Sequence, residues 1–228
     1  MAQFDKFAGT YDELHAESIK ASGYGPSYFD EMKIMEVYRS LKSAREMKFL
    51  NFGCGIGKSE KYIRRYFPFS MIYSVDVSEE SVKAARERNS DLEDIRFETF
   101  DGYNVPFEVE FDVIFIANVL HHVPFERHLP LLRNLCGKLR KNGTLFLFEH
   151  NPLNPLTVNA VNACEFDKDA RLLSPLYTRS ILSKSGFLRK QVRFIVFFPR
   201  FLSFLLPCEK YLRKVPIGAQ YYYMAKKT

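Results

Sequence analysis

The chain has 228 residues, of which 46% are apolar and 26% charged, and its formal net charge is +6. This length and balance exclude a disordered chain and suit one α/β domain with additions. The basic residues are scattered, so a nucleic-acid partner is not expected.

Helical and β-rich segments alternate through the first 150 residues. "PSYFDEMKIMEVYRSL" (26–41) predicts a helix with Pro26 at its first position. The strands are expected at 47–52, 71–77, 95–100, 111–117 and 144–150, and the helices between them at 57–67, 78–89 and 125–143. This alternation predicts a parallel sheet covered by helices on both faces.

The pattern changes after residue 150. The two Asn-Pro steps of "EHNPLNPLT" predict a loop. A helix is expected at 178–187, with Thr178 as its cap and Gly186 as its stop. Strands are expected at 190–198 and 219–227, and the segment 199–216 between them is interpreted as an insertion.

Three glycines alternate with other residues in "FLNFGCGIGKSE" (49–60). A phosphate loop would need glycine where Phe52 stands, and a dinucleotide turn needs glycines at relative positions 0, 2 and 5 rather than 0, 2 and 4. Glycines nevertheless let a ligand approach the backbone closely. Asp76, at the end of the second strand, stands where nucleoside-binding sheets bind ribose hydroxyls. Together these features predict a nucleoside site.

Four motifs in the same order, "FLNFGCGIG", "YSVDVSEESVKAAR", "FDVIFIANVLHHV" and "LRKNGTLFLFEH", resemble those of class I S-adenosylmethionine-dependent methyltransferases. The nearest resemblance is to the small-molecule branch of the ubiquinone/menaquinone-biosynthesis type. It implies an α/β Rossmann-like fold whose seven-stranded, mostly parallel sheet has the order 3-2-1-4-5-7-6, the last strand being antiparallel, with helices on both faces. It also implies S-adenosyl-L-methionine as cofactor and a small-molecule acceptor, such as a glycan, lipid-linked or quinone-like precursor.

The resemblance divides the single domain, 1–228, into N-terminal cap helices (1–44), a cofactor-binding core (45–150) and a substrate-side region (151–228). It also implies a role for individual residues. The glycines would lie near the methionine part of the cofactor, Asp76 at the ribose, and Val77, Phe100 and Asp101 at the adenine. The residues implied in cofactor binding are Tyr11, Asn51, Gly53, Cys54, Gly55, Gly57, Asp76, Val77, Phe100, Asp101 and Asn118.

Asn51 departs from the resemblance, because relatives usually carry Asp or Glu at this position. Asparagine keeps a carbonyl acceptor and loses the charge. The sequence therefore predicts that cofactor binding is retained but weaker, and that Asn51→Asp would strengthen it.

Methyl transfer to a hydroxyl or an activated carbon is helped by a base. The candidates at the predicted rim are His150, Glu149 and His122, with His121 beside them. No spacing such as H-x-x-x-H links these residues, and the four cysteines form no C-x-x-C pair, so no metal is expected.

The insertion mixes Phe and Leu with basic residues over 200–214, which predicts a helix on the sheet edge, a substrate lid, or a contact with anionic lipid. "EHNPLNPLT" and "FDKDARLLS" (166–174) are expected to frame the acceptor pocket. The N-terminus lacks the apolar core of a signal peptide, so a cytoplasmic protein, peripheral at the inner membrane face if it touches lipid, is expected. Two other functions remain open: an impaired methyltransferase-like partner or scaffold, and an NAD-dependent oxidoreductase.

Overall fold

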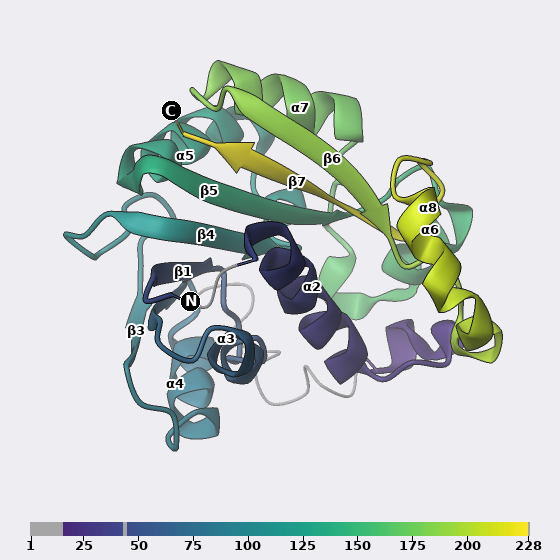
Figure 1. Ribbon diagram of the computed structural model, residues 1–228, viewed down its shortest axis with the longest axis horizontal. Coiled ribbons are helices and arrows are strands. Elements are labelled where there is room, and N and C mark those ends of the chain that lie inside the picture. Colours follow the sequence, from purple (N-terminus) through teal and green to yellow (C-terminus); the bar gives the residue numbers. More distant parts are fainter. Residues whose placement is uncertain (1–15, 43–44, 228) are drawn as a thin grey trace.

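The computed structural model describes residues 16–42 and 45–227, which form one twisted sheet with helices around it (Figure 1). The strand order is β3-β2-β1-β4-β5-β7-β6. β7 runs antiparallel to both of its neighbours, whereas the pairs from β3 to β5 are parallel. The fold predicted from the sequence is therefore confirmed. The strands are β1 (Lys48–Phe52), β2 (Met71–Asp76), β3 (Ile95–Thr99), β4 (Phe111–Ala117), β5 (Leu139–His150), β6 (Arg189–Ile195) and β7 (Gln220–Lys226).

Helices cover the sheet on two sides, and short 3-10 turns (η) join several of them. The helices and turns are η2 (Lys20–Ser22), α2 (Pro26–Leu41), α3 (Glu60–Tyr66), α4 (Glu79–Arg88), η3 (Leu120–His122), α5 (Phe125–Lys138), α6 (Pro155–Ala163), η4 (Glu165–Asp167), α7 (Pro175–Lys184), η5 (Arg200–Cys208) and α8 (Glu209–Leu212).

Successive side chains along each strand point to opposite faces of the sheet and so contribute to two cores. The central strands are nevertheless continuous apolar runs in the sequence. Leu50 and Tyr221 face a core with α5 and α7, whereas their neighbours Phe49 and Tyr222 face a second core with α2 and α3. All four side chains are fully buried. Burial on both faces is the reason that these strands lack polar alternation in the sequence.

Several predicted boundaries differ from the structure. α5 ends at Lys138 rather than near 143, because Leu139 is fully buried and already pairs with Phe111 as the first residue of β5. The loop expected after residue 150 contains α6, whose first turn Asn154 caps by accepting a hydrogen bond from Thr157 N. α7 begins at Pro175 and is capped by Ser174.

The expected cap of α7, Thr178, lies inside that helix, where its hydroxyl is 2.8 Å from the Tyr221 hydroxyl. The 199–216 insertion forms η5 and α8 beyond the edge strand β6. Among the described residues, no helix is long and apolar enough to cross a membrane. Tyr11 lies outside the described residues.

Candidate active site

The glycine turn after β1 opens onto the main cavity of the described structure. Gly53 N and Cys54 N both donate to Val75 O, at 2.8 and 2.9 Å, and Gly55 N donates to Asp76 Oδ2 at 2.8 Å. Gly55 has a φ of +52°, and a Cβ built on it would meet no atom within 4 Å. The backbone at Gly55 is therefore a cradle that any side chain would fill.

Gly57 has a different role from the one the resemblance implied. Its carbonyl accepts a hydrogen bond from Asn89 Nδ2, and a Cβ on it would lie 2.8 Å from the Ala85 Cβ. Gly57 therefore allows α4 to pack closely against the turn, and it does not line the cavity.

Asn51 is bound to a buried carboxylate behind the turn. Its Nδ2 donates to Glu60 Oε1 at 2.7 Å, and the Ser74 hydroxyl donates to the same oxygen at 2.8 Å. Glu60 is fully buried, and its Oε2 has no hydrogen-bond partner among the described residues. Burial raises the pKa of the Glu60 carboxyl, although the two hydrogen bonds partly offset it. Thus Glu60, the first residue of α3, supplies a carboxyl group next to the uncharged Asn51.

A cavity of about 1210 Å³ begins at this turn. Most of the predicted cofactor residues line it, but Asp101 does not. The Asp101 carboxylate instead accepts hydrogen bonds from Tyr103 N and Asn104 N, at 2.7 Å each, which fold its own loop and lower its pKa. The predicted cofactor residues that line the cavity are Asn51, Gly53, Cys54, Gly55, Asp76, Val77, Phe100 and Asn118.

Asn118 and Lys33 are two polar side chains of the cavity wall that could bind charged groups of a ligand. Asn118 has a φ of +57° after β4, and its buried Oδ1 accepts no hydrogen bond from any described residue. Lys33 of α2 is only 5% exposed and lines the same cavity. Burial lowers the pKa of the Lys33 ammonium, and Asp30 and Glu149 oppose this effect. An acceptor and a cation facing one cavity fit the ammonium and carboxylate of an amino-acid group.

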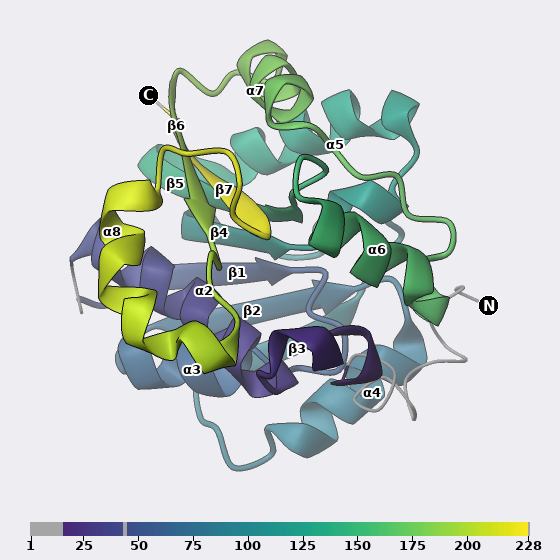
Figure 2. The same ribbon diagram turned by 90° about the vertical axis from the view of Figure 1, so that its right-hand side faces the viewer.

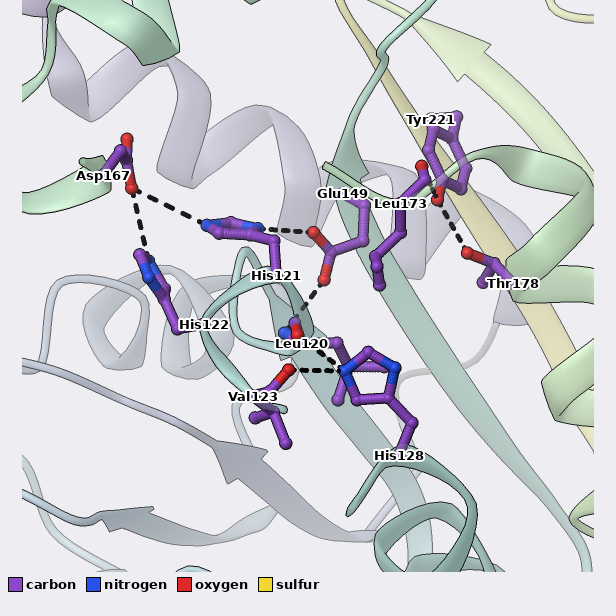
Figure 3. A network of polar contacts seen from close by, with 10 residues as sticks. All are labelled: Leu120, His121, His122, Val123, His128, Glu149, Asp167, Leu173, Thr178 and Tyr221. Carbon is purple, nitrogen blue, oxygen red and sulfur yellow. Dashed lines mark hydrogen bonds and ion pairs between the residues drawn. The ribbon is translucent and has the colours of Figure 1, made fainter. Parts of the chain in front are cut away.

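At the ends of β4 and β5, four ionisable side chains form a chain of contacts (Figure 3). Glu149 Oε1 accepts from Leu120 N at 3.0 Å, and Glu149 Oε2 lies 2.6 Å from His121 Nδ1. On the other side of this ring, Asp167 Oδ1 lies 3.7 Å from His121 Nε2 and 3.2 Å from His122 Nε2. His121, His122 and Asp167 line the cavity, and so does His150, whereas Glu149 stands behind them.

The electrostatics of this chain follow from its burial. Burial alone would lower the pKa of His121, but Glu149 and Asp167 outweigh it and raise that pKa to about 9. For Asp167, burial would raise the pKa, but contacts with His121 and His122 lower it well below its usual range. The arrangement concentrates buried charge in the cavity wall at the ends of β4 and β5.

Backbone contacts hold the histidines in place. His128 Nε2 lies 2.9 Å from both Leu120 O and Val123 O, and the Tyr177 hydroxyl lies 2.8 Å from its Nδ1. Both carbonyls are acceptors, so Nε2 carries the proton and Nδ1 accepts from Tyr177. The turn η3 is thereby fixed between α5, α7 and β5.

Sequence reasoning missed Lys33, Glu60 and Asp167. Each lies on a helix or turn outside the motifs that mark the strand ends, so those motifs gave no sign of it. For Lys33, the one available signal was a lysine among the apolar residues of 26–41.

The chain is similar in sequence to known methyltransferases. Residues 50–147 match the family model described as "Methyltransferase domain". The chain is 29% identical over 158 residues to 27-O-demethylrifamycin SV methyltransferase of Amycolatopsis mediterranei, and this match covers 63% of the chain and 55% of the relative. The chain thus spans about half the length of that curated relative.

Solved structures share the fold at low identity. An S-adenosylmethionine-dependent methyltransferase from Archaeoglobus fulgidus is 16% identical with a TM-score of 0.67, and the match covers 89% of this chain and 95% of that one. Phosphoethanolamine N-methyltransferase 2 of Haemonchus contortus, solved with S-adenosyl-L-methionine, is 16% identical with a TM-score of 0.66. This match covers 100% of this chain and 60% of that one.

Proposed function

We propose that this protein transfers a methyl group from S-adenosylmethionine to an apolar small molecule, a function supported by the match of residues 50–147 to the methyltransferase-domain family model. One observation carries the proposal: a single cavity of about 1210 Å³ joins the open glycine turn to the His121–Asp167 network. Sites for one drug-sized ligand usually measure about 300–1,000 Å³, so this cavity has room for a cofactor and an acceptor together.

The methyltransferase-domain match supports S-adenosylmethionine as the cofactor, as the sequence predicted. We propose that Asp76 binds the ribose, that Gly55 adjoins the ligand, and that Lys33 and Asn118 hold the carboxylate and ammonium of the methionine part. When bound, the cofactor supplies an activated methyl group on a sulfonium. The strand order also differs from the 3-2-1-4-5-6 order of dinucleotide-binding sheets, which weakens the NAD alternative.

The rest of the cavity is proposed as the acceptor chamber. Its wall between α6 and η5 is mostly apolar, and another part of its wall is the polar network of His121, His122 and Asp167. The residues of the apolar wall include Leu156, Ala160, Val161, Phe197, Phe198, Pro199 and Phe201. This combination fits an apolar molecule that presents one polar group to be methylated. A quinone-like or lipid-linked precursor has this character, and the relative named for a 27-O-methylation supports oxygen as the atom that is methylated.

The chain's own residues would align and deprotonate the acceptor. Alignment of the nucleophile with the methyl group is the main requirement of such a displacement. We propose that His150, whose ring centre lies 5.3 Å from that of His121, accepts the acceptor's proton. His122 would orient the same end through Asp167, and Glu149, which does not line the cavity, would fix the ring of His121.

Calorimetric titration with S-adenosylhomocysteine, S-adenosylmethionine and NAD tests this function. We expect both sulfur nucleosides to bind with one site per chain and NAD not to bind. Binding of NAD alone would replace the proposal with the oxidoreductase, and failure of all three would leave a scaffold protein.

The proposed role of Lys33 predicts a ligand-specific loss of affinity. Replacing Lys33 with methionine should weaken S-adenosylhomocysteine binding about 10- to 100-fold, since a hydrogen bond to a charged group contributes about 1.5–3 kcal/mol. The same thioether without its carboxylate, S-adenosyl-3-thiopropylamine, should bind both proteins about equally. Lys83→Met, an exposed site on α4, is the matched control. An equal loss for both ligands would refute the contact with the carboxylate.

We also propose that the insertion contacts anionic lipid at the mouth of the acceptor chamber. Phe201 and Phe204 of η5 are 78% and 71% exposed, and Leu156 of α6 is 77% exposed. Figure 2 looks at this end of the molecule, where α6 and α8 flank the sheet. Arg213 is bound to Glu36 at 2.6 Å, so Arg200, Lys210 and Lys214 remain as the basic groups of the insertion available to lipid.

Sedimentation with anionic vesicles should therefore carry the parent protein down at low salt, and much less of the Phe201→Ser/Phe204→Ser double variant. Vesicles of neutral lipid and Leu176→Ser, a change at an exposed leucine on α7, serve as controls. If the parent stays in the supernatant at low salt, the insertion is a lid or an edge helix only.

A further inference from the structure

We propose that His121, His122 and Asp167 bind one divalent transition-metal ion in the wall of the acceptor chamber, where the ion would hold an oxygen of the acceptor. The inference rests on the proposed function only for that last step, because the binding of the ion can be measured by itself.

The distances between the donor atoms suit one ion. One donor atom of each of the three residues lies within 4.8 Å of the other two. Asp167 Oδ1 is 3.7 Å from His121 Nε2 and 3.2 Å from His122 Nε2. Ligands about 2.0–2.1 Å from a tetrahedral ion lie roughly 3.3 Å apart. Small side-chain movements would therefore bring all three donors to one centre.

Glu149 prepares His121 as a ligand. A histidine that binds metal through one nitrogen usually donates its other ring N–H to a carboxylate or a carbonyl. Glu149 Oε2 lies 2.6 Å from Nδ1 of His121, and the second oxygen of Glu149 is held by Leu120 N. The remaining nitrogen, Nε2, is buried and makes no hydrogen bond with any described residue, yet it points toward Asp167 (Figure 3).

The donor types select the class of ion. Two imidazoles and one carboxylate suit zinc, iron, cobalt or nickel, whereas magnesium and calcium prefer sets made of oxygen only. All three proposed ligands line the cavity, so a fourth position would face the chamber.

Such an ion would activate a hydroxyl acceptor as it activates bound water, by lowering the pKa of the O–H group. The proton passes to His150 and then to bulk water. The oxygen then forms its bond to the methyl carbon, the carbon–sulfur bond breaks, and its electron pair stays on sulfur. One proton is released for each methyl group transferred, and no oxidant or reductant is needed.

The test uses the full chain after removal of metal with a chelator. Zn²⁺ is titrated calorimetrically, and Co²⁺ is followed by its visible spectrum. We expect one Zn²⁺ per chain and a Co²⁺ spectrum of nitrogen and oxygen ligands without thiolate bands. Asp167→Asn should lower the Zn²⁺ affinity at least 10-fold, and Glu149→Gln should lower it about 10- to 100-fold through the His121 ring. Asp169→Asn, an exposed neighbour, should bind as the parent does.

The proposal is overturned if the parent binds no Zn²⁺, if Asp167→Asn binds as tightly as the parent, or if thiolate bands show that cysteines hold the ion. Should Asp167→Asn fail to fold, ¹⁵N NMR of the histidine rings in the parent decides, since Zn²⁺ must shift Nε2 of His121 and His122. Titration of the same samples with S-adenosylhomocysteine separates this outcome from failure of the methyltransferase proposal.

Discussion

Asn51→Asp is expected to destabilise the protein by about 2–3 kcal/mol at neutral pH and to give no gain in affinity for S-adenosylhomocysteine. The new carboxylate would lie at hydrogen-bond distance from Glu60, because Asn51 Nδ2 is 2.7 Å from Glu60 Oε1. Two carboxyl groups so close in a buried site cannot both ionise. One of them must keep its proton, so the variant adds no net charge for the cofactor.

The loss of stability should depend on pH in a defined direction. The added acid has a higher pKa in the folded state than in the unfolded chain, so the folded state binds the extra proton more tightly. Stability is then retained below the unfolded pKa of about 4 and lost as the pH rises through the folded pKa. Urea unfolding from pH 5 to pH 8 should show a growing difference between the variant and the parent.

Two further variants make this result specific. Asn51→Asp/Glu60→Gln restores a donor–acceptor pair with reversed roles, and we expect it to recover most of the lost stability at pH 8. Asn162→Asp, an exposed change on α6, should be nearly neutral. A stable Asn51→Asp protein that binds S-adenosylhomocysteine more tightly would instead support the weaker-cofactor interpretation drawn from the sequence.

The sheet could be predicted because its signals are local. Buried parallel strands are apolar runs, and each is followed by a helical segment or a polar turn, so the strand positions were predicted to within a few residues for most strands. The boundary at Leu139 could not be predicted, since "LCGKLRKNG" is compatible with a helix and only pairing with Phe111 makes it a strand. Tertiary contact overrode local preference there.

The cavity was predictable where a motif marks the end of a strand, as at Asp76 and Asn118, which both line it. The side chains that form hydrogen bonds and ion pairs with the motif residues could not be predicted from the sequence. Asn51 is uncharged, but Glu60, nine residues later on α3, supplies a carboxyl group that accepts a hydrogen bond from it. Similarly, Asp167, which contacts His121 and His122, comes from η4, the turn that follows α6. The proposed ligands His121, His122 and Asp167 therefore form no spacing motif in the sequence.

Gly55→Ala and Gly57→Ala should separate cofactor binding from stability, although the two glycines stand two residues apart. Gly57 has a φ of +71°, and a Cβ there would lie 2.8 Å from the Cβ and 2.9 Å from the Cα of Ala85. Strain of the left-handed backbone and overpacking against α4 together should cost about 2–4 kcal/mol of unfolding free energy. Gly55 has a φ of +52° and open space around it, so only the backbone term of about 1–2 kcal/mol applies.

For affinity, the expected order is the reverse. The Cβ at Gly55 would occupy the cradle beside Asp76, so Gly55→Ala should bind S-adenosylhomocysteine at least about 10-fold more weakly, a cost of about 1.4 kcal/mol. The folded fraction of Gly57→Ala should bind nearly as the parent does, because its added atom points at α4. Urea unfolding and calorimetry on both variants measure the two effects. If Gly55→Ala keeps full affinity while Gly57→Ala loses it, the ligand lies on the α4 side of the turn and the cavity does not hold the cofactor.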